Sequence, residues 1–121
     1  MNYNTRSIRL FIGAKNFERS SHFYRELGYE ENRLSAKMSY FEISDSIGFY
    51  LQDYYVKKWV NNSMMFLEVD DLDSCYQETV KKELPVNYKN VKLGKIIDED
   101  WGREFHLWDP SGVLWHFGEF V

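Results

Sequence analysis

Two stretches of the chain align with two later stretches, which indicates that one structural unit occurs twice. The aligned pairs are FIGAKNFERS at 11–20 with FLEVDDLDSC at 66–75, and FEISDSIGFYLQ at 41–52 with FHLWDPSGVLWH at 105–116. In the second pair, the turn residues Asp45 and Asp109 coincide, and Gln52 coincides with His116. A chain built in this way is expected to fold into two similar halves.

Each copy of the repeat reads as a strand, a helix and three further strands. Asn16 and Asp71 follow the first strand of their copies, where a side-chain oxygen can accept from free amides in the first turn of a helix. Gly28 is expected to end the first helix and Pro85 to close the second. The expected helices are 17–27 and 72–83, and the expected strands are 8–14, 29–34, 38–44, 48–53, 64–69, 91–97, 103–108 and 113–119.

The predicted fold class is α+β, with tandem βαβββ modules that form curved mixed sheets around a cavity and with the helices outside. We expect a single domain over 1–121, with module one at about 6–53, a linker at about 54–62 and module two at about 63–121. Each helix has an apolar stripe that can cover a sheet face. The stripes are Phe17, Ser20, Tyr24 and Leu27 in the first helix, and Leu72, Cys75, Tyr76 and Val80 in the second.

The composition argues against several classes of function. A net charge of −4 without a clear Lys/Arg stripe argues against nucleic-acid binding. Cys75 is the single cysteine, which rules out an intrachain disulfide and is typical of a reducing compartment. The N-terminal MNYNTRSIRLFIGA lacks the apolar region of a signal peptide, and no stretch is apolar enough to span a membrane. We therefore expect a cytoplasmic protein without a membrane partner.

Three motifs of the second copy, WGREF at 101–105, DPSG at 109–112 and HF at 116–117, add to the pattern, as does FYRELGY at 23–29. With the tandem order of elements, they resemble the vicinal oxygen chelate superfamily, which includes glyoxalase I, extradiol dioxygenases, fosfomycin resistance enzymes and bleomycin resistance proteins. The resemblance covers nearly the whole chain. The first three motifs look most like the bleomycin resistance proteins, whereas FYRELGY is a general superfamily signal. The resemblance implies the glyoxalase/bleomycin resistance fold.

Enzymes of this superfamily hold a divalent metal with one His, Glu or Gln from the first and last strand of each copy. The corresponding positions here are Arg9, Gln52, Met64 and His116. An arginine cannot ligate a metal at ordinary pH, and a methionine thioether is a poor ligand for hard divalent ions. We therefore expect no metal at this centre and no cofactor.

In the bleomycin resistance proteins, the tryptophan of the WGREF-like motif stacks on the planar bithiazole of the drug, in a groove between two subunits, and Trp101 matches it. The resemblance implies a metal-independent binder that sequesters a planar ligand or antibiotic, such as a bleomycin-type glycopeptide, without turnover. An equal alternative is that Trp101 plugs the cavity or an interface. The acidic residues Glu30, Glu31 and Glu42 would suit a cationic ligand. No catalytic residue is expected, and the expected ligand-binding residues are Trp101, Met38, Tyr40, Phe49, Arg9, Gln52 and His116.

The smallest members of the superfamily pair or exchange copies between subunits. A homodimer is therefore expected here, and the aromatic linker residues Tyr54, Tyr55 and Trp59 would fit its interface. Two other functions stay open: a lyase, isomerase or dioxygenase of the glyoxalase type with an atypical metal set, and a structural module whose cavity is filled by side chains. Two interpretations of Glu104 and His106 stay open: an acid/base pair, or two residues on the solvent-exposed face of a strand. The strand register decides which face they occupy.

Overall fold

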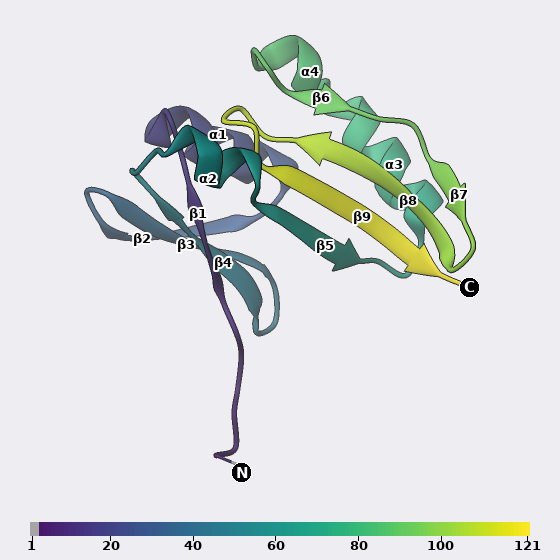
Figure 1. Cartoon of the computed structure of the whole chain (residues 1–121), viewed down its shortest axis with the longest axis horizontal. Coiled ribbons are helices and arrows are strands. Elements are labelled where there is room, and N and C mark those ends of the chain that lie inside the picture. Colours follow the sequence, from purple (N-terminus) through teal and green to yellow (C-terminus); the bar gives the residue numbers. More distant parts are fainter. Residues whose placement is uncertain (1–2) are drawn as a thin grey trace. The chain divides into compact units, whose positions relative to one another are not determined.

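The computed structural model describes residues 3–121, so residues 1–2 of the expected domain lie outside the described residues. The described chain forms two compact units, of which the first ends at Tyr55 and the second begins at Val56. Each unit contains a mixed β-sheet and a helix packed against it (Figure 1). The predicted α+β class with two βαβββ-like modules is therefore confirmed.

The first unit has a four-stranded sheet in the order β1-β4-β3-β2. β1 pairs with β4 in parallel, and the other neighbouring strands are antiparallel. Because successive side chains of a strand point to opposite faces, one face can pack on a helix while the other stays open. The elements are β1 Leu10–Gly13, α1 Phe17–Leu27, β2 Glu30–Ser35, β3 Met38–Ser44 and β4 Ile47–Gln52.

Helix α1 covers one face of this sheet and has the predicted caps. The Asn16 side chain accepts a hydrogen bond from the backbone N–H of Arg19 at 3.0 Å, and Gly28 ends the helix with φ 111°. Tyr24 is fully buried, with its ring centroid 5.6 Å from that of Phe41 and 5.0 Å from that of Phe49. The predicted stripe is confirmed by the buried residues of α1, which are Phe17, Ser20, Ser21, Phe23, Tyr24 and Leu27.

The second unit repeats this plan with one more strand. Its sheet has the order β5-β9-β8-β6, and β7 pairs with β8 on the same edge as β6. Helix α3 packs on β8 and β9 (Figure 1) and begins at the N-cap Asp71, as predicted. The elements are α2 Lys57–Asn61, β5 Met64–Glu68, α3 Leu72–Lys81, α4 Leu84–Asn87, β6 Lys92–Leu93, β7 Ile97–Glu99, β8 Gly102–Trp108 and β9 Leu114–Phe120.

Three expectations about local structure were wrong, and the linker holds a helix that was not expected. Pro85 does not close the second helix: α3 ends at Lys81, and Pro85 lies in the first turn of α4, where the backbone N–H that it lacks would have no helical partner. The expected strand 91–97 is interrupted at 94–96, beginning at Gly94. The expected linker contains the short helix α2. Val80 is 46% exposed, and Thr79 is buried in its place.

The DPSG turn joins β8 to β9 and is organised by one buried carboxylate. Oδ1 of Asp109 accepts from the backbone N–H groups of Ser111, Gly112 and Val113 at 2.8, 2.9 and 2.9 Å. Gly112 has φ 107°, a conformation that glycine adopts without strain. This turn sets the register of the hairpin, in which His106 pairs with His116. In the part of the chain that the structure describes, no helix is long and apolar enough to cross a membrane.

Candidate ligand-binding site

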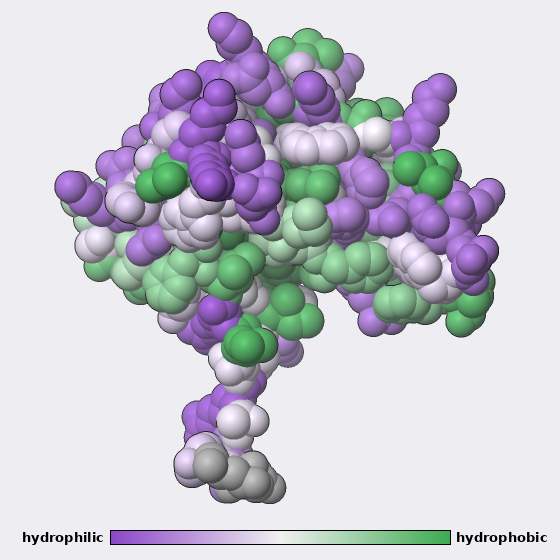
Figure 2. All heavy atoms as spheres, viewed as in Figure 1, coloured by the Kyte–Doolittle hydropathy of each residue, from purple (hydrophilic) through white to green (hydrophobic). Residues whose placement is uncertain are grey.

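The face of the second sheet that points away from α3 carries a group of aromatic rings. Trp101 lies just before β8, and its ring centroid is 5.5 Å from that of Phe66 on β5 and 5.3 Å from that of Phe120 on β9. Phe66 and Phe120 are 45% and 54% exposed. In Figure 2 apolar side chains gather at the surface over β5 and the C-terminal end of β9. In these three residues, the Trp101 cluster, the half-exposed rings of Phe66 and Phe120 and the partly exposed ring of Trp101 form a surface on which a flat molecule could stack.

Two glycines make room for the Trp101 cluster. A Cβ atom at Gly118 would lie 2.2 Å from the ring of Phe66. The Phe66 ring can therefore lie directly on the backbone of β9 because residue 118 has no side chain. A Cβ atom at Gly102 would lie 2.0 Å from the carbonyl oxygen of Glu119. The close approach of the two backbones continues at Trp101, whose carbonyl oxygen accepts from the N–H of Val121 at 3.1 Å. Trp101 is therefore anchored by its backbone beside β9.

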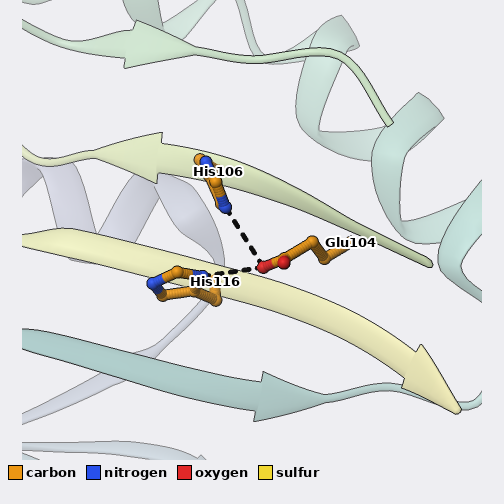
Figure 3. Close-up of side chains that lie close together, drawn as sticks. All are labelled: Glu104, His106 and His116. Carbon is orange, nitrogen blue, oxygen red and sulfur yellow. Dashed lines mark hydrogen bonds and ion pairs between the residues drawn. The ribbon is translucent and has the colours of Figure 1, made fainter. Parts of the chain in front are cut away.

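Glu104, His106 and His116 form a polar group (Figure 3), which lies on the same face as the Trp101 cluster because His116 is the cross-strand partner of Phe66. Oε1 of Glu104 lies 3.1 Å from Nε2 of His106 and 2.7 Å from Nδ1 of His116. Burial alone would raise the pKa of the Glu104 carboxyl, but its hydrogen bonds to His116 and then His106 outweigh burial and lower it. The ring of His116 stacks on Phe66, with centroids 6.4 Å apart. The polar group and the Trp101 cluster therefore adjoin each other through Phe66.

Arg103, the other charged residue of WGREF, has a structural role. The Arg103 guanidinium lies on the α3 side and donates to both carboxylate oxygens of Asp73, at 3.1 and 3.0 Å, and to Glu119 at 2.9 Å. Glu119 also accepts from the N–H of Leu72 at 3.0 Å, and that bond, followed by the one from Arg103, lowers the pKa of its carboxyl. Arg103 thus ties α3 to β8 and β9 and does not face a ligand on the Trp101 side.

The first sheet also has a face that points away from its helix, and Arg9 lies on it. The Arg9 guanidinium is 4.2 Å from the ring centroid of Tyr40 and donates to the hydroxyl of Tyr50 at 3.0 Å. The ring of Tyr50 stacks on Phe11 at 4.8 Å. Met38 and Gln52 are direct cross-strand partners next to this group. Four of the expected ligand residues, Arg9, Met38, Tyr40 and Gln52, therefore share one face of this unit.

Two residues lie on the other face of the first sheet, contrary to the roles expected of them. Phe49 is 2% exposed and packs under α1, so it cannot line a surface together with Tyr40. Glu31 also points to the α1 side, where it bonds Ser39, Arg25 and Arg33. Burial alone would raise the pKa of the Glu31 carboxyl, but the bonds from Ser39 and then Arg25 lower it. The charge of Glu31 is thus balanced internally and is not available to a cationic ligand.

The four positions that correspond to the superfamily's metal ligands do not fit a divalent ion. Arg9 carries a permanent positive charge and is already bound to Tyr50 and Tyr40. Met64, which is 59% exposed, offers a thioether. Two of the four donors are therefore absent, because a cation and a soft sulfur replace them.

A pocket of about 340 Å³ lies in the second unit and is lined by Asn61, Asn90, Lys92, Trp108 and Gly112. The expected ligand residues are not among these five. The ring of Trp108 meets that of His106 edge-on, with centroids 5.8 Å apart. The pocket is therefore linked to His106 only through Trp108, and the Trp101 cluster does not line it.

Comparison with solved structures agrees with this architecture. A bleomycin-binding protein in complex with bleomycin superposes with a TM-score of 0.80 over 97% of this chain and 100% of its own, at 16% identity. A bleomycin resistance determinant encoded on transposon Tn5 gives 0.76 over 96% and 98%, at 18% identity. The chain has the glyoxalase/bleomycin resistance fold.

A third structure with this glyoxalase/bleomycin resistance fold is TnmS3, an antibiotic-binding protein from Streptomyces sp. CB03234. Its TM-score is 0.72 over 97% of this chain and 98% of its own, at 14% identity. No protein-family model and no curated protein sequence matches the chain. At such low identity the likeness establishes the fold, and the ligand has to be argued from this chain's own residues.

Sequence reasoning missed several residues of the two faces. Phe66 and Phe120 were not expected beside Trp101, and Tyr50 was not expected beneath Arg9. Glu104 and His106 were left undecided between two faces. A signal was present for the latter pair, since a hairpin centred on the DPSG turn pairs His106 with His116 and puts Glu104 on the same face.

Proposed function

We propose that the chain binds a planar small molecule by stacking at the Trp101 cluster and sequesters it without turnover, as bleomycin-binding proteins hold their drug. The observation that carries the proposal is the aromatic surface formed by the partly exposed Trp101 and the half-exposed Phe66 and Phe120. Flat heteroaromatic rings gain about 0.5–1.5 kcal/mol from such contacts in addition to the area that they bury. His116, stacked on Phe66, supplies a polar contact beside this surface.

The other proposed ligand-binding residues lie on the face of the first sheet that points away from α1. Arg9 and Gln52 are the polar members of this set, and Met38 and Tyr40 are the apolar ones. The Arg9 guanidinium covers Tyr40, and the carboxylates of Glu30 and Glu42 lie on the same face, so this face carries charges of both signs. The proposed ligand is therefore a planar molecule that presents a neutral or anionic group to Arg9.

The proposed assembly is a homodimer with the ligand groove between subunits. Exposed apolar side chains such as Phe11, Met64 and Phe120 support it, since apolar patches on a surface mark interaction sites. The single domain over 1–121 and a cytoplasmic location stay predictions. A glyoxalase-type metal enzyme finds less support, because Arg9 and Met64 replace two ligands. A purely structural module finds less support, because the rings of the Trp101 cluster are partly exposed.

The proposal is tested by calorimetric titration of metal-free bleomycin into the protein in buffer with EDTA. One ligand per subunit is expected, with affinity reduced at least about tenfold in Trp101→Ala. Trp108→Ala is the matched control, because it removes a tryptophan whose ring contacts His106 instead. Equal affinity in wild type and Trp101→Ala would reject the stacking role. If bleomycin releases no heat at all, the same titration is repeated with other planar antibiotics.

A further inference from the structure

The two histidines of the second sheet and the carboxylate between them have the composition of a metal site. Glu104 and His106 are alternate residues of β8, and His116 is the cross-strand partner of His106 on β9. All three side chains therefore lie on the face away from α3 (Figure 3). One donor atom from each residue lies within 4.8 Å of the other two. Two imidazole nitrogens and one carboxylate oxygen thus converge without a backbone change.

The distances suit a single small ion. A metal with bonds of about 2.0–2.1 Å in tetrahedral geometry separates neighbouring donor atoms by about 3.3 Å. The carboxylate oxygen of Glu104 lies 3.1 Å from the His106 nitrogen and 2.7 Å from the His116 nitrogen. Side-chain rotations would have to lengthen these two separations slightly and bring the two imidazole nitrogens, which lie within 4.8 Å of each other, closer together. Both imidazoles already point at the same carboxylate oxygen, so the ion would replace the protons that now connect them.

We propose that Glu104, His106 and His116 bind one divalent transition-metal ion of the Zn²⁺ type. Two imidazoles and a carboxylate favour Zn²⁺, Ni²⁺ or Cu²⁺ over Mg²⁺ and Ca²⁺, which prefer oxygen ligands throughout. Three protein ligands leave at least one coordination position for water or a bound molecule. Of the three residues, His116 alone occupies a position where the superfamily resemblance implies a ligand. His116 also adjoins the proposed stacking surface through Phe66, but the metal proposal does not rest on the stacking function.

The residues around His106 and His116 determine the metal affinity that we expect of this site. Phe66 stacks on His116 and Trp108 meets His106 edge-on, so apolar rings hold both imidazoles in place. Nε2 of His116 is buried and has no hydrogen-bond partner among the described residues. An ion on Nδ1 would put the proton on this Nε2, where it lacks an acceptor. We therefore expect micromolar rather than nanomolar affinity.

The test is titration of Zn²⁺ into the EDTA-treated and dialysed full chain, in competition with a chromophoric chelator. One ion per chain is expected. Glu104→Gln, His106→Asn and His116→Asn should each weaken binding at least about tenfold. His22→Asn is the matched control, since His22 is the chain's third histidine and also lies beside a carboxylate, Glu26, at 3.5 Å. It should leave the affinity unchanged.

Two further readouts keep the proposal falsifiable if a variant folds poorly. Co²⁺ in place of Zn²⁺ should give the visible absorption of a low-coordinate site in the wild type and lose it in Glu104→Gln, whose fold is checked by circular dichroism. Trp101→Ala should keep Zn²⁺ binding, which separates this site from the stacking surface. No binding at millimolar Zn²⁺, or binding that survives His116→Asn and disappears in His22→Asn, would overturn the proposal.

Discussion

Trp101 has a large side chain, whereas its neighbour Gly102 lies at a position with no room for one. The ring of Trp101 is partly exposed, and any side chain at position 102 would meet the carbonyl oxygen of Glu119. The ring can be displayed at this place because the next residue lets the backbones of β8 and β9 approach. Trp101 thus provides the aromatic ring, and the adjacent Gly102 allows the backbones of β8 and β9 to pack closely.

Gly102→Ala should destabilise the protein by about 2–4 kcal/mol, since the added methyl lies 2.0 Å from the Glu119 oxygen in a backbone with φ 156°. Urea unfolding followed by tryptophan fluorescence measures the loss. Gly94→Ala is the control, because the nearest atom to its added Cβ is at an ordinary 3.7 Å. Equal stability of the two variants would contradict the close approach.

Asp109→Ala should cost about 3 kcal/mol, because three backbone N–H groups lose their acceptor in a buried turn. Asp109→Asn keeps an acceptor oxygen and should recover part of this stability. Asp45→Ala, at the aligned but exposed position of the first unit, should change little. Thermal and urea unfolding check the order wild type, Asn variant, Ala variant.

Among the helices and strands, the sequence predicted correctly the features that depend only on neighbouring residues, such as the helix caps. The caps Asn16, Gly28 and Asp71 were confirmed because each needs only its own turn. Val80 was misplaced because α3 buries Leu72 and Thr79, and a short stripe on a ten-residue helix does not specify which neighbour faces the sheet. Phe49 was misassigned for a similar reason, since alternation gives two faces without saying which one meets the helix.

Glu31 connects β2 to α1 through Arg25, and this contact should make stability depend on pH. Its folded-state pKa is lowered, so its contribution is present above the unfolded-state value of about 4.5 and is lost as pH falls through the folded-state pKa. The stability gap between wild type and Glu31→Gln should therefore be largest near neutral pH and shrink in acid. Urea unfolding from pH 7 to pH 3 measures it. Glu30→Gln, which changes the exposed neighbouring carboxylate, should show no such trend.

For the whole molecule, the repeat in the sequence led directly to two similar units, and solved structures share their fold. The ligand could not be predicted in the same way, because it depends on which residues of two open sheet faces are displayed. Trp101 was identified by a motif, but Phe120 joins it through the register of the β8–β9 hairpin, and Phe66 joins it through the order of the strands in the sheet. Motifs therefore located one residue of the surface, and topology supplied the others.

The proposed dimer is tested on the full chain. Light scattering coupled to gel filtration at micromolar concentration should give twice the 14.6 kDa chain mass. A Tyr54→Ser/Trp59→Ser double variant should shift the equilibrium towards the single chain, because it removes exposed aromatic area that an interface would bury. A monomeric wild type would count against the dimer while leaving the Trp101 cluster intact.

The turn held by Asp109 also limits how such a chain can diverge over generations. Adding or deleting one residue in β9 just after the turn would point Trp115 and Phe117 outward and bury His116, so length changes there should be eliminated by selection. Substitutions at the outward-facing positions of β8 and β9 other than Gly102 and Gly118 leave the core untouched. New ligand preferences in descendants of this protein should therefore arise by replacing side chains at fixed spacing from the turn, and hardly ever by insertion or deletion.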